Sequence, residues 1–242
     1  PVKMKDPEFI EELRSYHADL QVVVAFRMLP EVVWAMPRLG TFNVHAALLP
    51  QYRGAAPINW AVINGETQTG VTTFFLDKDI DTGRIIMQKP FDIPDTANVE
   101  YIYDGLMHLG ATIAIDTINL IASKLPEDNL DVDFSRVLDE ISVPQEQENI
   151  ELKSAPKIFK ETCEINWSQP AKIIYDFIRG LSPYPGAWSS LVLNDDSESK
   201  PLVMKVYKTS KTNRAATGTV GNLVVEKNRL YVNTTDNLLE LL

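Results

Sequence analysis

The chain is poor in the residues that build covalent or metal-held frameworks. Its 242 residues include one cysteine, Cys163, and three histidines, His17, His45 and His108. A single thiol excludes an intrachain disulfide and a metal site built from several cysteines, and it is typical of a reducing compartment. We therefore expect a cytoplasmic protein that needs no metal.

Long apolar runs are also missing. No stretch approaches 18 uninterrupted apolar residues and no secretory signal opens the chain, so we expect no membrane span. With 45% hydrophobic and 23% charged residues, the composition is that of a globular protein. It excludes a disordered, collagen-like or disulfide-scaffold chain, and the length predicts one large domain or two small ones.

Acidic residues outnumber basic residues by 33 to 23, which gives a net charge of −10. This charge argues against a nucleic-acid partner, because like charges repel. The acidity is uneven, however: residues 1–125 carry −5, residues 126–153 carry −7 and residues 154–242 carry +2. The last part contains a basic run without an acid, formed by Lys200, Lys205, Lys208, Lys211 and Arg214. This run is either a surface for a polyanion or a sheet edge protected by lysines.

The first half of the chain alternates helical and strand-like segments. We expect helices in 6–20, 30–36, 54–64 and 98–123, and strands in 21–26, 40–50, 70–77 and 83–93. This alternation predicts an α/β domain, partly Rossmann-like, with a largely parallel sheet, and the apolar run at 21–26 predicts a strand covered on both faces. A doubly wound domain normally opens with a strand, so we expect about half of the domain to precede Pro1.

The second half divides into an acidic segment and a β-rich end. Residues 126–153 read as a linker, the alternative being an ordered segment whose Phe134, Val137, Leu138 and Ile141 pack. A helix over 170–179 closed by Gly180, followed by short strands in 187–193, 202–209, 218–227 and 230–234, predicts a small antiparallel barrel. The expected division is therefore a catalytic domain 1–125, a linker 126–153 and a barrel-like domain 154–242.

Three polar residues of the first half are candidates for chemistry. Asn43 and His45 lie two positions apart at the end of the strand in 40–50, so their side chains face the same side. Asp81 lies in an Asp-Thr-Gly turn that could approach this strand end, where open α/β sheets place their sites. The pair alone does not separate a structural role from a functional one.

A family resemblance rests on longer motifs. Residues 42–71, FNVHAALLPQYRGAAPINWAVINGETQTGV, followed by 76–88, LDKDIDTGRIIMQ, resemble the folate-dependent formyltransferases. Residues 164–188, EINWSQPAKIIYDFIRGLSPYPGAW, resemble the start of the C-terminal domain of the methionyl-tRNA formyltransferase subfamily. The family's serine before Leu-Leu-Pro is Ala47 here. Relative to this family, roughly the first 75 residues are expected to precede Pro1, by the half-domain argument.

The resemblance implies a fold and an activity. It implies a Rossmann-like catalytic domain joined to a small, OB-like barrel domain that binds tRNA. The expected reaction transfers a formyl group from 10-formyltetrahydrofolate to the amino group of initiator methionyl-tRNA, in a monomer without a metal. One rival is a formyltransferase that acts on an amino-sugar nucleotide, a purine-pathway enzyme being less favoured. The rival from another class is a non-catalytic tRNA-binding fragment.

The resemblance also assigns residues. Asn43 would donate to the oxyanion, His45 would be a second donor and an acid or base, and Asp81 would raise the His45 pKa and relay the amine proton. Folate contacts are expected from Ala47, Leu48, Leu49 and Pro50, with loop packing as the alternative. Contacts to tRNA are expected from Arg53, Lys200, Lys205, Lys208, Lys211 and Arg214, with a structural role for Arg53 as the alternative.

Overall fold

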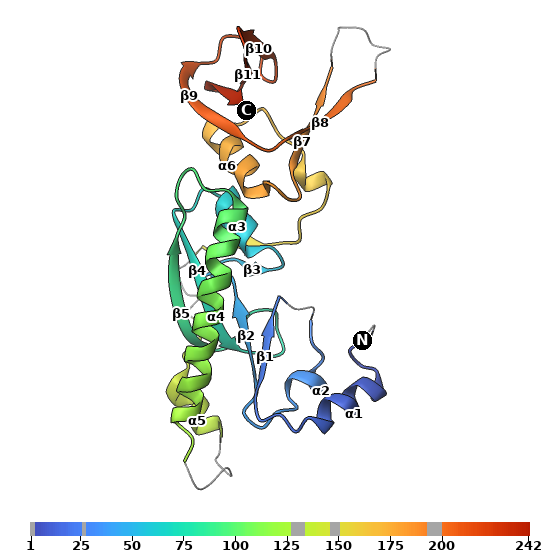
Figure 1. Ribbon diagram of the computed structural model, residues 1–242, viewed down its shortest axis with the longest axis vertical. Helices are drawn as coiled ribbons and strands as arrows, with labels where there is room; N and C mark the ends of the chain where they lie inside the picture. Colours follow the sequence, from blue (N-terminus) through green and yellow to red (C-terminus); the bar gives the residue numbers. More distant parts are fainter. Residues whose placement is uncertain (1–2, 26–27, 127–133, 146–150, 193–199) are drawn as a thin grey trace. The chain divides into compact units, whose positions relative to one another are not determined.

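The computed structural model describes residues 3–25, 28–126, 134–145, 151–192 and 200–242. The chain forms two compact units, which are described separately (Figure 1). The first unit consists of Pro1–Gly54, Thr69–Asp92 and Gly105–Ser154. The second consists of Ala55–Gln68, Ile93–Asp104 and Ala155–Leu242. Neither unit is one continuous stretch of sequence.

The described helices of the first unit are α1 (Pro7–Ser15), α2 (Glu31–Trp34), most of α4 (Val99–Ser123) and α5 (Phe134–Ile141). Helix α4 matches its expected bounds within one residue, α1 ends five residues earlier than expected, and α5 lies where the sequence suggested a linker. Asp6 caps α1, because its carboxylate accepts a hydrogen bond of 3.0 Å from the Glu8 amide. Local capping chemistry therefore fixes the start of α1, as its sequence indicates.

The sheet of the first unit has the strand order β1-β2-β4-β5. The strands are β1 (Gln21–Val24), β2 (Thr41–His45), β4 (Gln68–Phe75) and β5 (Ile85–Asp92). The α/β class is confirmed, but the largely parallel sheet is a wrong prediction: β1 is parallel to β2, whereas β4 is antiparallel to β2. Since β4 is buried at every position after Gln68, its apolar run carries no information about its direction.

The predicted coverage of the first strand on both faces is also wrong. Val22 is 40% exposed and Val24 is 61% exposed, so burial alternates along β1. Strand β1 lies at the edge of the sheet, next to β2 only. A run of valines satisfies the β propensity of an edge strand as well as that of a central one.

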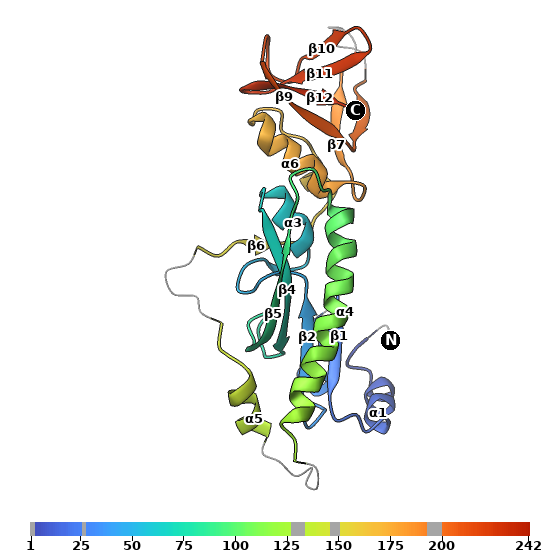
Figure 2. The same cartoon turned by 60° about the vertical axis from the view of Figure 1, so that its left-hand side comes forward.

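The core of the first unit includes part of the segment that the sequence suggested as a linker. Its buried side chains come from the turn before β2 and from β2, β4, α4 and α5. They are Leu39, Phe42, Phe75, Ile121, Val137 and Ile141. The Phe134 ring packs edge-on against Phe75 with centroids 5.6 Å apart. Helix α5 lies beside the C-terminal part of α4 (Figure 2). The described part of 126–153 is thus ordered, while 127–133 and 146–150 lie outside the described residues.

Helix α4 is the one described helix that is long and apolar enough to cross a membrane, judged by length and composition alone. Ile113 and Ile121 of this helix are buried in the first unit. A core helix of a globular protein passes the same test, so the finding is weak evidence for a membrane span.

Close packing of two helices organises the second unit. Helix α3 (Pro57–Ile63) packs against α6 (Ala171–Leu181) where Gly180 meets Ile63. A Cβ at Gly180 would lie 2.6 Å from Ile63 Cγ1, and the Asn59 amide donates a 2.8 Å hydrogen bond to the Gly180 carbonyl. The sequence suggested that Gly180 ends the helix, but Gly180 lies within α6. Its missing side chain permits the close contact with Ile63 of α3.

The β-rich end consists of two separate sheets. Strands β9 (Thr209–Ala215), β10 (Leu223–Glu226), β11 (Arg229–Asn233) and β12 (Asn237–Leu241) form an antiparallel sheet of order β10-β11-β12-β9. Strands β7 (Ala187–Leu191) and β8 (Leu202–Val206) form a second one. The predicted barrel closure is not confirmed, since the described strands form no closed barrel. The sequence reading missed β9, which is almost entirely polar, and β12.

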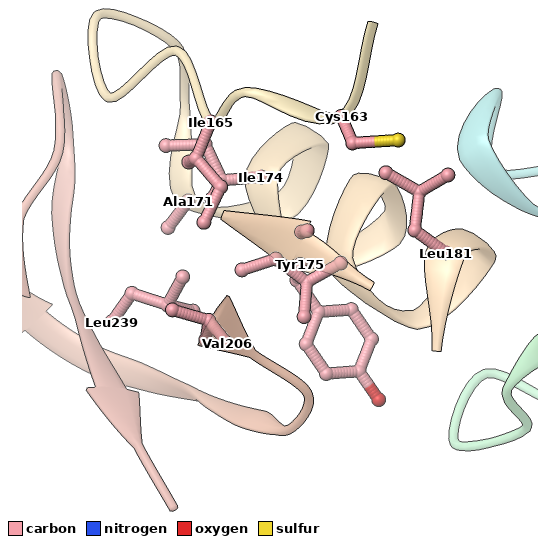
Figure 3. Packing of buried hydrophobic residues seen from close by; sticks show 10 residues of the cluster. Cys163, Ile165, Ala171, Ile174, Tyr175, Leu181, Val206 and Leu239 are labelled. Atoms are coloured by element: carbon pink, nitrogen blue, oxygen red, sulfur yellow. The ribbon is translucent and has the colours of Figure 1, made fainter. Parts of the chain in front are cut away.

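The core of the second unit lies under α6 (Figure 3). Ile174, Ile178 and Leu181 of this helix pack with Val206 of β8 and Leu239 of β12. The remaining buried members of the cluster are Cys163 of the 3₁₀ turn η1 (Glu161–Cys163), Ile165, Ala171, Tyr175 and Ala187. Cys163 is a buried free thiol, and burial raises its pKa, as expected for an unreactive cysteine.

A buried ion pair fastens residues 93–104 to α6. Asp176 and Arg179 are 4% and 7% exposed, and the Arg179 Nε donates to Asp176 at 2.7 Å. The same guanidinium donates to the carbonyls of Pro94 and Ala97, at 3.3 and 2.8 Å, while Lys172 binds the other Asp176 oxygen. Each buried charge is therefore paired, as burial in a low dielectric requires.

Removing the carboxylate should destabilise the second unit. Asp176→Ala leaves Arg179 buried without its counter-charge, and we expect a loss of about 3–5 kcal/mol in the free energy of unfolding. Urea unfolding followed by circular dichroism measures this loss. Glu226→Ala, which breaks an exposed pair with Arg214 in the same unit, is the matched control and should shift the midpoint far less. Equal effects of the two variants would contradict the role of the buried pair.

Candidate active site

The end of β2 carries two of the three candidate residues. Asn43 pairs with Val23 of β1 and with Phe74 of β4, and His45 pairs with Thr72 of β4. Side chains two positions apart on a strand share a face, so the expected common orientation of Asn43 and His45 follows from the observed strand. Asp81 lies in the connection between β4 and β5.

The imidazole of His45 is enclosed and its tautomer is defined by a backbone contact. The residue is 6% exposed, and Nε2 lies 2.9 Å from the carbonyl oxygen of Tyr52. A carbonyl only accepts, so Nε2 carries the proton. In the neutral ring, Nδ1 is then the basic nitrogen, and it lies 3.9 Å from Asp81 Oδ2. The predicted proximity of His45 and Asp81 is thus present.

A backbone amide also holds the Asp81 carboxylate. Its Oδ2 accepts a hydrogen bond of 2.9 Å from the Gly54 N–H. Asp81 has a φ of 55° and Tyr52 a φ of 59°, both in the left-handed region that side chains rarely adopt. The two residues that face His45 therefore both occupy strained backbone positions, which cluster at functional sites.

Burial determines the charge of His45. Desolvation lowers the pKa of His45 below its ordinary value of 6.5, although the Asp81 carboxylate and the hydrogen bond to the Tyr52 carbonyl both act to raise it. The predicted rise of this pKa is wrong in direction, because loss of hydration outweighs the nearby negative charge. His45 is therefore a neutral group with a free lone pair at neutral pH.

Asn43 contains an unsatisfied polar atom. Its side-chain Oδ1 is buried and has no hydrogen-bond partner. Buried polar atoms are almost always paired, and an exception indicates a ligand site or stored strain. Asn43 and His45 lie on one face of β2, so the unpaired oxygen fits a site that receives a hydrogen-bonding group of a substrate.

The four predicted folate contacts differ in burial. The side chains of Ala47 and Leu49 are buried, whereas Leu48 and Pro50 are half-buried. The Thr72 hydroxyl donates to the Ala47 carbonyl at 2.6 Å and accepts from the Leu49 amide at 3.1 Å. Burial of the Ala47 and Leu49 side chains favours the packing alternative for these two residues.

The predicted tRNA contacts also differ in their surroundings. Arg53 donates through Nε and Nη2 to the side-chain oxygen of Gln145, at 3.1 and 2.5 Å, which supports its structural alternative. In the second unit, Lys211 pairs with Asp95 and lowers the pKa of that carboxyl, and Arg214 pairs with Glu226.

Three lysines of the basic run differ from these two pairs. Lys205 donates to the Pro185 carbonyl at 2.6 Å, and Lys200 and Lys208 are exposed.

Sequence reasoning missed the backbone and amide partners of the site. The Tyr52 carbonyl and the Gly54 amide are main-chain groups, so their contacts leave no residue-type signature. Gln145 is 64 positions from Asp81 and lies in the acidic segment, where no motif marks it. Within the described part of the chain, no cluster of three or more His, Cys, Asp or Glu side chains could hold a metal.

Family models match both parts of the chain. A formyl transferase model matches residues 1–118, and a model for the formyl transferase C-terminal domain matches residues 157–242. Among curated relatives, the methionyl-tRNA formyltransferases of Bacteroides fragilis, Parabacteroides distasonis and Flavobacterium johnsoniae are 54%, 51% and 44% identical to the whole chain. The chain covers 70%, 70% and 71% of their lengths, respectively.

Solved structures support the same fold at lower identity. HypX from Aquifex aeolicus in complex with tetrahydrofolic acid is 19% identical, with a TM-score of 0.66 over 98% of this chain and 37% of that chain. WlaRD, a sugar 3N-formyl transferase, is 20% identical, with a TM-score of 0.58 over 91% of this chain and 70% of that chain. At this identity the likeness concerns the fold alone.

The lowered pKa of His45 predicts a pH-dependent stability. In the unfolded chain a histidine binds its proton near pH 6.5, whereas His45 in the folded protein stays neutral to lower pH. The unfolded state therefore binds more protons below about pH 6.5, and the stability falls as the pH decreases through this range. In His45→Gln this part of the pH dependence should disappear.

Urea midpoints of the wild type and His45→Gln, measured between pH 7.5 and 5.5, check this expectation. The stability of the wild type relative to His45→Gln should decrease on acidification. The matched control is His108→Gln, at an exposed position of α4. A rise in the stability of the wild type relative to His45→Gln as the pH falls would rule out a buried neutral imidazole.

Proposed function

Since the chain belongs to the formyl transferase family, we propose that it transfers a formyl group from 10-formyltetrahydrofolate to the amino group of initiator methionyl-tRNA. Relatives that are 44–54% identical over the whole chain are methionyl-tRNA formyltransferases, which supports this acceptor. The observation that carries the proposal is the arrangement of Asn43, His45 and Asp81 at the end of β2.

The reaction requires stabilisation of a tetrahedral intermediate. The amine nitrogen attacks the formyl carbon, the C=O bond becomes C–O⁻, and collapse breaks the bond to the folate nitrogen. The Asn43 amide group donates to the developing oxyanion, and one such donor typically contributes about 3–4 kcal/mol. The unpaired Oδ1 of the same amide is able to accept a hydrogen from the attacking amine.

The amine must also lose a proton, which finally reaches the leaving folate nitrogen. His45 has its Nε2 hydrogen directed to the Tyr52 carbonyl, so Nδ1 is the nitrogen available for proton transfer. Asp81 faces this nitrogen and favours the protonated ring that forms transiently. A base that is neutral at pH 7 fits this role better than the charged donor suggested by the sequence.

A folate donor suits the loop that follows β2. Leu48 and Pro50 are the half-buried members of the predicted set and offer apolar contact to a pterin ring. The backbone groups of Ala47 and Leu49 hydrogen-bond to the Thr72 hydroxyl of β4 and hold this loop against the sheet.

The tRNA would be bound by the β-rich end of the chain. Lys200 and Lys208 are exposed and are the favoured phosphate contacts. Lys211 and Arg214 would first have to leave their partners Asp95 and Glu226. In this division, residues 1–125 supply catalysis and residues 154–242 supply tRNA affinity, in a cytoplasmic monomer.

Substitution of the three site residues tests the activity. In the complete gene product, Asn43→Ala, His45→Ala and Asp81→Asn should each reduce turnover about a hundredfold or more, because each removes a group that acts in the transition state. Formylation of charged initiator tRNA with 10-formyltetrahydrofolate measures this.

Asp79→Asn, in the same connection but exposed, is the matched control and should retain activity. An amino-sugar nucleotide tested in parallel identifies the rival acceptor. Formylation of that sugar and not of tRNA would overturn the proposal, and near-normal turnover would remove the residue concerned from the mechanism.

Salt dependence tests the basic run. Lys200→Ala and Lys208→Ala should each weaken tRNA binding and reduce the slope of log K against log salt concentration by about one unit, because each removes one phosphate contact. Filter binding between low and moderate salt measures this slope. Lys227→Ala, an exposed lysine between β10 and β11, is the control, and an equal effect there would indicate attraction without a defined site.

A further inference from the structure

The Asp81 turn is anchored by the segment that follows α5. Val143 and Ile85 exchange two backbone hydrogen bonds of 2.8 Å each, which pair this segment with the start of β5. Next to this pairing, Arg84 donates to the Ser142 hydroxyl at 2.9 Å and to the Ser142 carbonyl at 2.7 Å. The backbone after α5 thus runs alongside the residues that follow Asp81.

Gln145 lies at the end of this anchored segment, where its amide group connects two parts of the site. Its Nε2 donates to the Asp81 carbonyl at 2.9 Å and to the Gly83 carbonyl at 2.8 Å. Its Oε1 accepts from Nε and Nη2 of Arg53. One side chain therefore links the turn that carries Asp81 to Arg53, the residue between Tyr52 and Gly54.

The amide is the functional group that these neighbours require. Two carbonyl oxygens on one side need two N–H donors, and a guanidinium on the other side needs an acceptor. A glutamate would place a carboxylate against the two carbonyls, and an apolar residue would leave them unpaired. Only the amide orientation with oxygen toward Arg53 satisfies both sides.

The linked residues are those that define His45. Arg53 lies between the carbonyl that binds Nε2 and the amide that binds Asp81 Oδ2. Asp81 itself holds a positive φ of 55°, so its backbone needs support from outside the turn. Gln145 supplies that support, together with the close contact at Gly83, where a Cβ would lie 1.6 Å from the Phe75 carbonyl.

We propose that Gln145 is a positioning residue for formyl transfer, which holds the Asp81 carboxylate facing Nδ1 of His45. The proposal rests on the function proposed above, but its structural part is testable without activity. Gln145 touches neither reacting group and acts through Asp81 and Arg53.

The first test follows the His45 titration by NMR in the 242-residue chain, with ¹³C-labelled histidine. The charged group that faces the ring is Asp81, and Arg53 lies beyond it through Gln145. Asp81 raises the His45 pKa against the effect of burial, so Gln145→Met should move the His45 titration to lower pH as the carboxylate loses its orientation. Ser142→Ala is the matched control, because it weakens the same segment through Arg84 without touching Asp81.

The second test is kinetic and uses the complete gene product. Gln145→Met and Gln145→Glu should lower kcat tenfold or more with less than a threefold change in KM for the folate donor, and Ser142→Ala should leave kcat unchanged. Equal losses of kcat in all three variants, or an unchanged His45 titration in Gln145→Met, would overturn the proposal. If the wild type formylates no tRNA, the function proposed above fails, and the titration still decides whether Gln145 orients Asp81.

Discussion

The burial of one imidazole between a backbone carbonyl and a carboxylate is the constraint on which the site depends. His45 loses its hydration, and the Tyr52 carbonyl binds its single N–H, so the ring has one tautomer and one basic nitrogen. Several neighbouring groups serve this arrangement. Two residues with left-handed backbone, the Gly54 amide and an anchored turn bring the Tyr52 carbonyl and the Asp81 carboxylate to opposite sides of the ring.

Supporting groups for this site come from far along the chain. Helix α5 packs Val137 and Ile141 into the core, and the segment after α5 pairs with β5 and reaches the Asp81 turn through Gln145. A stretch that carries nine acidic and two basic residues thus contributes ordered structure as well as charge. Two of its acids contribute to this role, because Asp139 pairs with Arg84 and Glu140 pairs with Lys124, beside the apolar, backbone and amide contacts.

The sequence predicted those parts that depend on local patterns. Capping by Asp6, the bounds of the long helix and the common face of Asn43 and His45 follow from spacing, and the proximity of Asp81 follows from the position of sites at the strand ends of open α/β sheets. Properties that depend on three-dimensional surroundings were beyond it. The direction of β4, the exposure of Val22 and Val24 and the lowered pKa of His45 depend on neighbours that are distant in sequence. Strand β9 was missed because its polar residues lack the alternation that marks a half-buried strand.

The contact at Gly180 has a consequence for how such chains can be divided. Helix α3, contributed by residues 57–63, and the strip 93–104 complete the second unit, although both lie outside the stretch that a family model recognises as the C-terminal domain. A protein cut or recombined near residue 155 would separate Gly180 from Ile63 and leave Arg179 without its carbonyl acceptors at Pro94 and Ala97. Exchange of C-terminal modules between relatives is therefore constrained by two short segments of the N-terminal part, which have to match the module that they complete.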